Sequence, residues 1–102
     1  MSDLRLERAL QRLPEHMRED VRLWIGQGLP HPALMGGFFR AVLMNDLVEA
    51  FAFADDENAR AMKAWAQWLY NDCPTPAWSR RGLLGALQEW HKRGGMKGID
   101  NA

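Results

Sequence analysis

Apolar side chains recur every three to four residues along most of this chain, and that spacing constrains the fold more than any other feature. Leu6, Ala9, Leu10 and Leu13 occupy positions i, i+3, i+4 and i+7, which lie on one face of an α-helix. β-branched residues, which favour strands, are scarce, whereas Ala, Leu, Met, Arg, Glu and Gln are abundant. The sequence therefore predicts an all-α fold without a sheet.

Helix-breaking and capping residues divide the chain into about six helices joined by short loops. Pro14 ends the first helix, and Gly28 ends the second. The apolar segment 34–54 is interrupted at Asn45-Asp46, where Asp46 can cap a new helix, so two helices are expected over 36–44 and 47–54. The sequence predicts a compact bundle.

The length of 102 residues fits one domain, expected over residues 1–95. Ser79 can cap the last helix, 79–93, which Gly94-Gly95 would end, so residues 96–102 are expected to form a disordered tail. There is no apolar run long enough to span a membrane and no pattern of a signal peptide. With a single cysteine, Cys73, the chain is expected in the cytoplasm.

The residues that could carry chemistry are few and poorly spaced. His16, His31, His91 and Cys73 have no metal-binding spacing, and neither Cys73 nor Ser79 has a local base. We therefore expect no catalytic, cofactor-binding or metal-binding residues, no cofactor and no enzymatic activity.

Charge is neutral overall but segregated along the sequence, which gives two candidate binding surfaces. The first combines tryptophans with the basic helix 79–93: Trp68, Trp78, Arg80, Arg81, Lys92 and Arg93. The second is acidic: Asp46, Glu49, Asp55, Asp56 and Glu57. The two could meet within the fold, or between copies as in a homodimer. Alternatively, the basic helix contacts phosphates or an acidic partner.

The stretch from Trp24 to Gly95 resembles a family of small, uncharacterised proteins encoded by bacteriophages and prophages. The likeness is carried by these segments: Gly28-Leu29-Pro30, Phe39 to Leu47, Ala54 to Asn58, Leu69-Tyr70-Asn71, Trp78, Trp90 and Arg93-Gly94-Gly95. The chain departs from the family pattern in the longer connector 31–35 and at Ser79-Arg80-Arg81. The resemblance implies a host-takeover, anti-defence or regulatory role in the cytoplasm of a bacterial host.

Two functions are expected from these features together. The first is a non-catalytic, phage-encoded protein-binding module that inhibits or modulates a host protein complex, such as a bacterial defence system in the manner of an anti-CRISPR protein. The alternative is a small nucleic-acid-binding regulator that uses the basic helix 79–93. Neither function involves a membrane.

Overall fold

The computed structural model describes residues 2–100, and within that range it contains eight α-helices, six of them with seven or more residues. Their bounds are α1 Ser2–Leu10, α2 Arg18–Gln27, α3 Gly37–Leu43, α4 Leu47–Phe53, α5 Asp56–Arg60, α6 Met62–Asn71, α7 Leu84–Arg93 and α8 Gly95–Asp100. Three 3-10 turns complete the order: η1 Glu15–Met17, η2 Pro32–Leu34 and η3 Thr75–Ala77. There is no strand in the described range, which confirms the all-α prediction.

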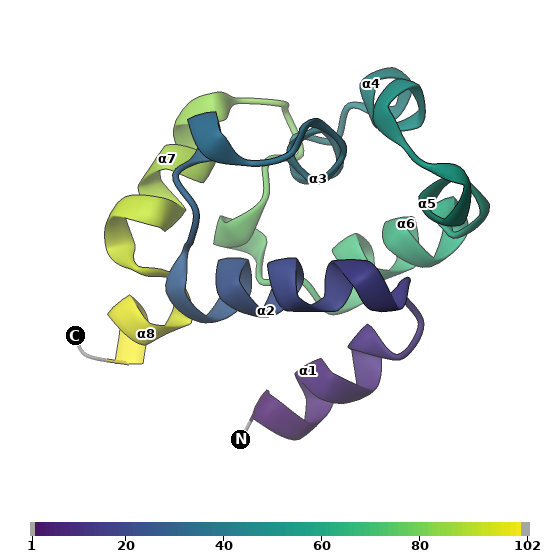
Figure 1. Ribbon diagram of the computed structural model, residues 1–102. Helices are drawn as coiled ribbons and strands as arrows, with labels where there is room; N and C mark the ends of the chain where they lie inside the picture. Colours follow the sequence, from purple (N-terminus) through teal and green to yellow (C-terminus); the bar gives the residue numbers. More distant parts are fainter. Residues whose placement is uncertain (1, 101–102) are drawn as a thin grey trace.

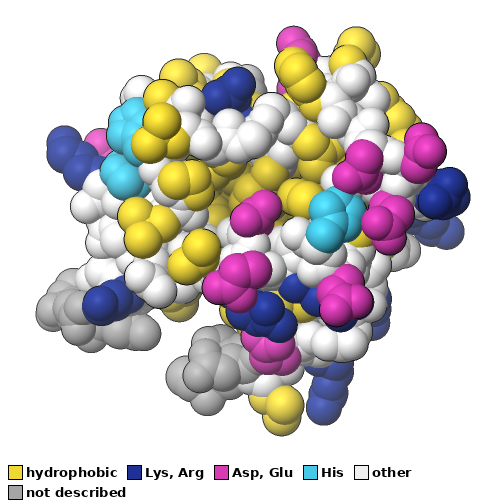
Figure 2. Space-filling model, in the orientation of Figure 1, with side chains coloured by type: hydrophobic (Ala, Val, Ile, Leu, Met, Phe, Trp, Pro, Cys, Tyr) yellow, Lys and Arg dark blue, Asp and Glu magenta, His cyan; other side chains and the backbone are white. Residues whose placement is uncertain are grey.

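The helices surround α2, which crosses the middle of the molecule (Figure 1). α3 lies above α2, α4 and α5 form one end, and α7 and α8 form the other, with α6 behind. The space-filling view of the same face shows hydrophobic side chains in a hollow between α2 and α3 (Figure 2). In the described part of the chain, the structure has no helix with the length and apolarity needed to cross a membrane.

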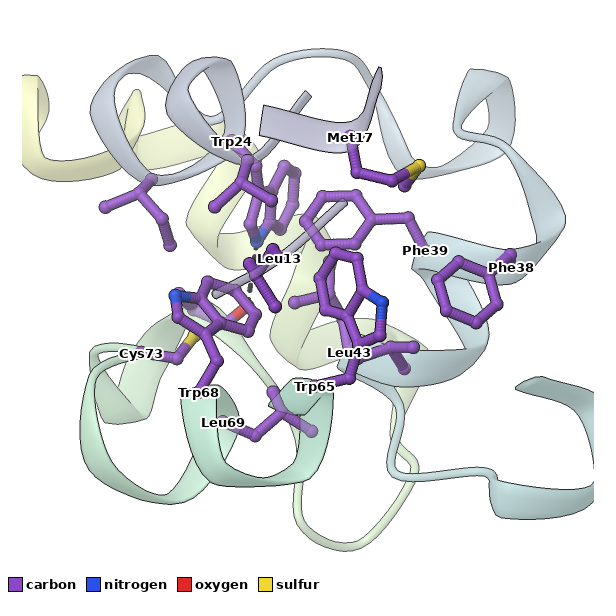
Figure 3. Close-up of a cluster of buried hydrophobic side chains, with 14 of the residues drawn as sticks. Leu13, Met17, Trp24, Phe38, Phe39, Leu43, Trp65, Trp68, Leu69 and Cys73 are labelled. Carbon is purple, nitrogen blue, oxygen red and sulfur yellow. Dashed lines mark hydrogen bonds between the residues drawn. The ribbon is translucent and has the colours of Figure 1, made fainter. Parts of the chain in front are cut away.

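The core is built from aromatic rings carried by α2, α3 and α6 (Figure 3). The ring of Phe39 lies 5.9 Å from that of Trp65 and 6.2 Å from that of Trp68, and the two indoles meet edge to face at 5.8 Å. Leu13, from the turn after α1, points in among these rings. Such rings remove a large apolar area from water, and their offset contacts add specificity to the packing.

Buried indole N–H groups tie together segments that are distant in sequence. Trp24 donates to the carbonyl of Ala77 at 2.9 Å, and Trp90 donates to the carbonyl of Trp24 at 2.7 Å. Trp65 donates to Oδ1 of the buried Asn58 at 3.1 Å. The N–H of Trp68 has no acceptor among the described residues. Three of these indoles therefore fix the position of a neighbouring segment as well as filling the core.

Arginines on α2 hold α1 in place. Arg22 binds both carboxylate oxygens of Glu7, at 2.7 and 2.8 Å, and this pairing lowers the pKa of Glu7 below its ordinary value. Arg18 donates to the carbonyls of Leu10 and Leu13, where α1 ends and the chain turns toward η1. Arg18 and Arg22 are thus both engaged in contacts between α1 and α2.

The predicted break between residues 44 and 47 is confirmed. Asn45 adopts a left-handed conformation (φ 56°), which asparagine tolerates better than most residues. Asp46 then caps α4 by accepting the backbone N–H of Glu49 at 3.1 Å. The chain changes direction at this pair, so α3 and α4 are separate helices.

The expectation of a disordered tail from residue 96 is wrong for the described part of it, because Gly95–Asp100 form α8. Gly94 ends α7 as predicted (φ 84°), but Gly95 brings its backbone against Gln27 and Gly28 at the end of α2. Met96 then packs against the core. A helix this short has too little apolar periodicity to be recognised in the sequence. Residues 101–102 lie outside the described residues.

The last long helix also starts later than predicted, at Leu84 and not at Ser79. Ser79 is buried, its N–H donates to the carbonyl of Leu43 at 2.8 Å, and its Oγ accepts the N–H of Leu83 at 2.9 Å. These bonds hold residues 79–82 as a turn against the end of α3, with Gly82 at a positive φ of 71°. Ser79 therefore stabilises a turn instead of capping the helix.

We expect opposite effects from alanine at two glycines near the end of α2. Gly28 has φ 67°, and an added Cβ would lie 2.8 Å from the carbonyl oxygen of Trp90, so Gly28→Ala should lower the free energy of unfolding by about 2 kcal/mol or more. Gly26 lies within α2 with no atom within 4 Å of an added Cβ, so Gly26→Ala should be neutral or raise it by up to about 1 kcal/mol. Urea unfolding measures both; equal effects would contradict the described packing.

A second pair of variants isolates the contribution of an indole hydrogen bond. Trp24→Phe and Trp68→Phe remove the same atoms from side chains that are 0% and 2% exposed. Only Trp24→Phe also leaves the buried carbonyl of Ala77 without its partner, so it should cost about 1–3 kcal/mol more. Urea unfolding followed by circular dichroism gives the difference. A larger cost for Trp68→Phe would show that the Trp24 bond contributes little.

Candidate functional site

The structure does not place the six residues of the first predicted surface together. Trp68 is 2% exposed, so including it in a partner surface was wrong. The reason is the rotation of α6, which turns positions 65, 68 and 69 inward and leaves Ala66 exposed. The indole of Trp68 is therefore part of the core.

The remaining residues of the first surface are at opposite ends of α7. Trp78 is half-buried, and the guanidinium carbon of Arg80 lies 5.4 Å from the centre of its ring, next to the exposed Arg81. Lys92 and Arg93 are at the other end of the helix, about 15 Å further along at the usual rise per residue. The basic side chains consequently form two small groups and no continuous stripe.

The acidic residues of the second surface are exposed, and two of them cap helices. Asp46 caps α4, and Asp55 caps α5 by accepting the backbone N–H of Asn58 at 2.8 Å. Glu49, Asp56 and Glu57 lie in the first turns of these helices, where negative charge is favourable. The cap at Asp46 is the one predicted above from the sequence.

His16 joins this acidic segment to the start of α2, a contact that the sequence does not predict. Its Nε2 lies 2.8 Å from Oδ2 of Asp55, and its Nδ1 lies 3.5 Å from Oε1 of Glu57, although 39 residues separate His16 from Asp55. The N–H of Asn58 and, to a smaller extent, His16 lower the pKa of Asp55 below its ordinary value. Asp55 is thereby held ionised, with its direction fixed by two partners.

Beside this cluster is a concave surface, which we call the apolar hollow (Figure 2). Its volume is about 420 Å³. Its floor is formed by buried side chains: Met17, Met35, Phe38 and Phe39. Its walls are the exposed side chains of Leu34 and Phe53, and its rim carries His16, Asp20 and Asp55. It is therefore apolar inside and acidic at its edge.

Phe53 holds its position in the wall through a close contact with Gly37. A Cβ added at Gly37 would lie 3.1–3.3 Å from three carbons of the Phe53 ring, so the ring rests on the backbone at the start of α3. The ring is nevertheless 57% exposed, and Leu34, which also lines the hollow, is 79% exposed. The sequence points to neither residue, because both belong to the apolar segment 34–54, whose side chains are expected in the core.

The groups considered for chemistry lie apart from the hollow or are already used. Burial raises the pKa of the Cys73 thiol well above its ordinary value, which disfavours the reactive thiolate. His31 and His91 meet edge to face with ring centres 4.9 Å apart. Across the described residues, no three His, Cys, Asp or Glu side chains are grouped so that they could hold a metal ion. What the hollow offers is shape, apolar area and negative charge.

The lowered pKa of Asp55 predicts a specific dependence of stability on acid. A carboxylate whose pKa is lower in the folded state stabilises the fold above its unfolded pKa, near 4, and that contribution is lost as the pH falls through the folded value. Asp55→Asn keeps an oxygen that can cap α5 but loses the charge beside His16. We expect it to be less stable than the wild type at pH 7 and to lose less stability between about pH 5 and pH 2.

Asp56→Asn is the matched control, because Asp56 is exposed in the same helical turn and lies outside the His16 contacts. Urea unfolding at several pH values gives both profiles. The acid dependence that remains in Asp55→Asn should come partly from Glu7, whose pKa is also lowered. Identical profiles for Asp55→Asn and the wild type would contradict a structural role for the Asp55 charge.

No protein-family model, no curated protein and no solved structure matches this chain. The likeness to phage-encoded proteins and the cytoplasmic location therefore stay predictions from the sequence.

Proposed function

We propose that the chain is a non-catalytic protein-binding module that acts by covering a surface of another protein, with the apolar hollow as its contact site. The resemblance to phage-encoded proteins suggests the partner, a bacterial host protein or complex such as a defence system. On this proposal the chain would work by inhibition or modulation, in the manner of an anti-CRISPR protein.

The observation that carries the proposal is the exposure of Leu34 and Phe53, which both line a hollow with an apolar floor. Large apolar side chains exposed together around a concavity are typical of interaction sites. Covering them would gain roughly 25 cal/mol per Å² of apolar area, and the wall positions are preformed. An aromatic ring braced by backbone, as Phe53 is by Gly37, loses little freedom on binding.

The chemistry of the hollow supports binding better than catalysis. Of its titratable groups, Asp55 is bound to a backbone N–H and to His16, which leaves Asp20 as the carboxylate without an ion-pair partner among the described residues. A general acid–base pair needs two groups aimed at one reacting centre with separated pKa values. The rim offers one engaged pair and one isolated carboxylate.

Nucleic-acid binding is the second candidate, supported by the Arg80–Trp78 contact beside the exposed Arg81. An arginine stacked on an aromatic ring is a common element of phosphate and base recognition. The wide separation of this group from Lys92 and Arg93 argues for few phosphate contacts. Its affinity would consequently fall only shallowly with salt.

Leucine-to-serine variants at two exposed positions test the proposed contact site. Leu34 in the wall of the hollow is 79% exposed and Leu4 on α1 is 69% exposed, so neither substitution should disturb folding. We expect a host protein to be retained from bacterial lysate by the wild-type chain. Leu34→Ser should weaken binding of the purified partner by about tenfold or more, whereas Leu4→Ser leaves it unchanged. Calorimetry or surface plasmon resonance measures the affinities.

Three results would count against this function. Retention of nothing above background would reject a host-protein partner. Loss of the retained material after nuclease treatment would favour the nucleic-acid candidate. Equal affinities for Leu34→Ser and Leu4→Ser would show that a partner exists but binds elsewhere on the chain. Sedimentation equilibrium of both variants separately reports whether Leu34 mediates dimer formation.

A further inference from the structure

We propose that the apolar hollow takes a basic amphipathic segment of a partner protein, with a bulky apolar side chain on its floor and lysine or arginine side chains against the rim. This inference rests on the proposed function and adds the chemistry of the partner to it.

The charges of the rim are the first reason. Asp20 from α2 and Asp55 before α5 both line the hollow, and Glu57 is 3.5 Å from His16 at the same edge. None of the thirteen described residues that line the hollow is lysine or arginine. Among the described residues that line the hollow, His16 is therefore the only basic one, and the carboxylates of Asp20 and Asp55 face the hollow beside it.

The arginines closest in sequence to Asp20 are committed elsewhere. Arg18 is bonded to the carbonyls of Leu10 and Leu13, and Arg22 is bonded to Glu7 and Glu19. Among the described residues, Asp20 makes no salt bridge within 4.0 Å. A cation supplied by a partner is thus the missing complement to Asp20, and opposite charges across an interface guide association and fix its register.

The floor and walls are the second reason, because they suit an apolar side chain. Met17 and Met35 contribute flexible thioethers, which adapt to the shape of an inserted group, and Phe38 and Phe39 contribute ring surface. A small hydrophilic ligand would leave the apolar floor exposed to water. A segment that alternates apolar and basic side chains matches both parts of the hollow, as when an amphipathic helix enters a groove.

The same observations disfavour other occupants. Nucleic acid and anionic membranes carry the same charge as the rim and would be repelled. A second copy could offer its own basic segment, residues 78–84, but the hollow and that segment are different surfaces. Such a head-to-tail contact does not close on itself unless its rotation happens to form a ring. A separate partner protein is therefore the occupant that we infer.

Nuclear magnetic resonance on the full ¹⁵N-labelled chain tests this with two synthetic probes. One is an amphipathic leucine–lysine peptide of about 18 residues, long enough to form a helix, and the other has glutamate at every lysine position. The lysine peptide should shift the amide signals of Met17, Asp20, Gly36 and Gly37, and the glutamate peptide should not. Asp20→Lys should lower the affinity of the chain for the lysine peptide by about tenfold.

Glu89→Lys is the matched control, because it changes the net charge equally and lies on α7 outside the hollow. It should alter the affinity by less than about twofold. Equal weakening by Glu89→Lys, equal binding of both peptides, or no shift with either peptide would overturn the inference. Shifts of the same signals on raising the protein concentration alone would identify a second copy as the occupant and also overturn it.

The affinities of the variants for the host partner retained from lysate distinguish this inference from the proposed function. If Leu34→Ser weakens binding of that partner and Asp20→Lys does not, the hollow binds a protein that is not basic. In that case only the present inference fails, and the proposed function stands. If neither variant affects the partner, the contact site itself is wrong. If both variants weaken binding of the partner and Glu89→Lys leaves it unchanged, the result supports the proposed function and this inference together.

Discussion

The hydrogen bond from the Trp24 indole to the carbonyl of Ala77 is the interaction on which the rest of the arrangement depends. It joins the central helix α2 to η3 across 53 residues of sequence, and the carbonyl of Trp24 in turn accepts the indole N–H of Trp90 across 66 residues. Both bonds are buried, where breaking one leaves a polar group unsatisfied at a cost of about 1–3 kcal/mol. With η3 fixed, the turn that follows reaches Leu43 through the N–H of Ser79 and holds the end of α3.

The hollow is a consequence of that placement combined with the break at Asn45-Asp46. Because Asn45 turns the chain out of α3, α4 packs back along α3, with Ala50 in the core, and brings Phe53 to the start of α3. Gly37 has no side chain to push the ring away, so Phe53 stands at the edge of a concavity that it does not fill. The floor of this concavity is the outer surface of the same aromatic core that α2 organises.

Local patterns in the sequence predicted the local structure well. These patterns are the scarcity of β-branched residues, the cap Asp46, and the stops at Gly28 and Gly94. Each acts within a few residues, and the structure confirms them. The errors concern how helices are rotated and where they meet. Whether Trp68 or Ala66 turns inward depends on which neighbours pack against α6, and the existence of α8 depends on the contact of Gly95 with Gln27.

Of the residues that line the hollow, only Asp55 belonged to a binding surface predicted from the sequence. Asp55 belonged to the second predicted surface, but its contact with His16 links positions that no spacing rule connects. The apolar half could not be found, because Leu34 and Phe53 look like ordinary members of a buried stripe. Their exposure follows from the chain turns at Met35 and Asn45, which are decided by tertiary packing and by one residue in a left-handed conformation.

The two rim carboxylates differ in what folding alone requires of them. Asp55 caps α5 and is bound by His16, so its charge beside the hollow is a by-product of a structural need. Asp20 lies in the first turn of α2, where its charge contributes only a few tenths of a kcal/mol to the helix, a role that Glu19 also fills. Asp20 lines the hollow and makes no salt bridge among the described residues, so it is the rim charge that the proposed basic partner would contact without displacing an interaction of the fold.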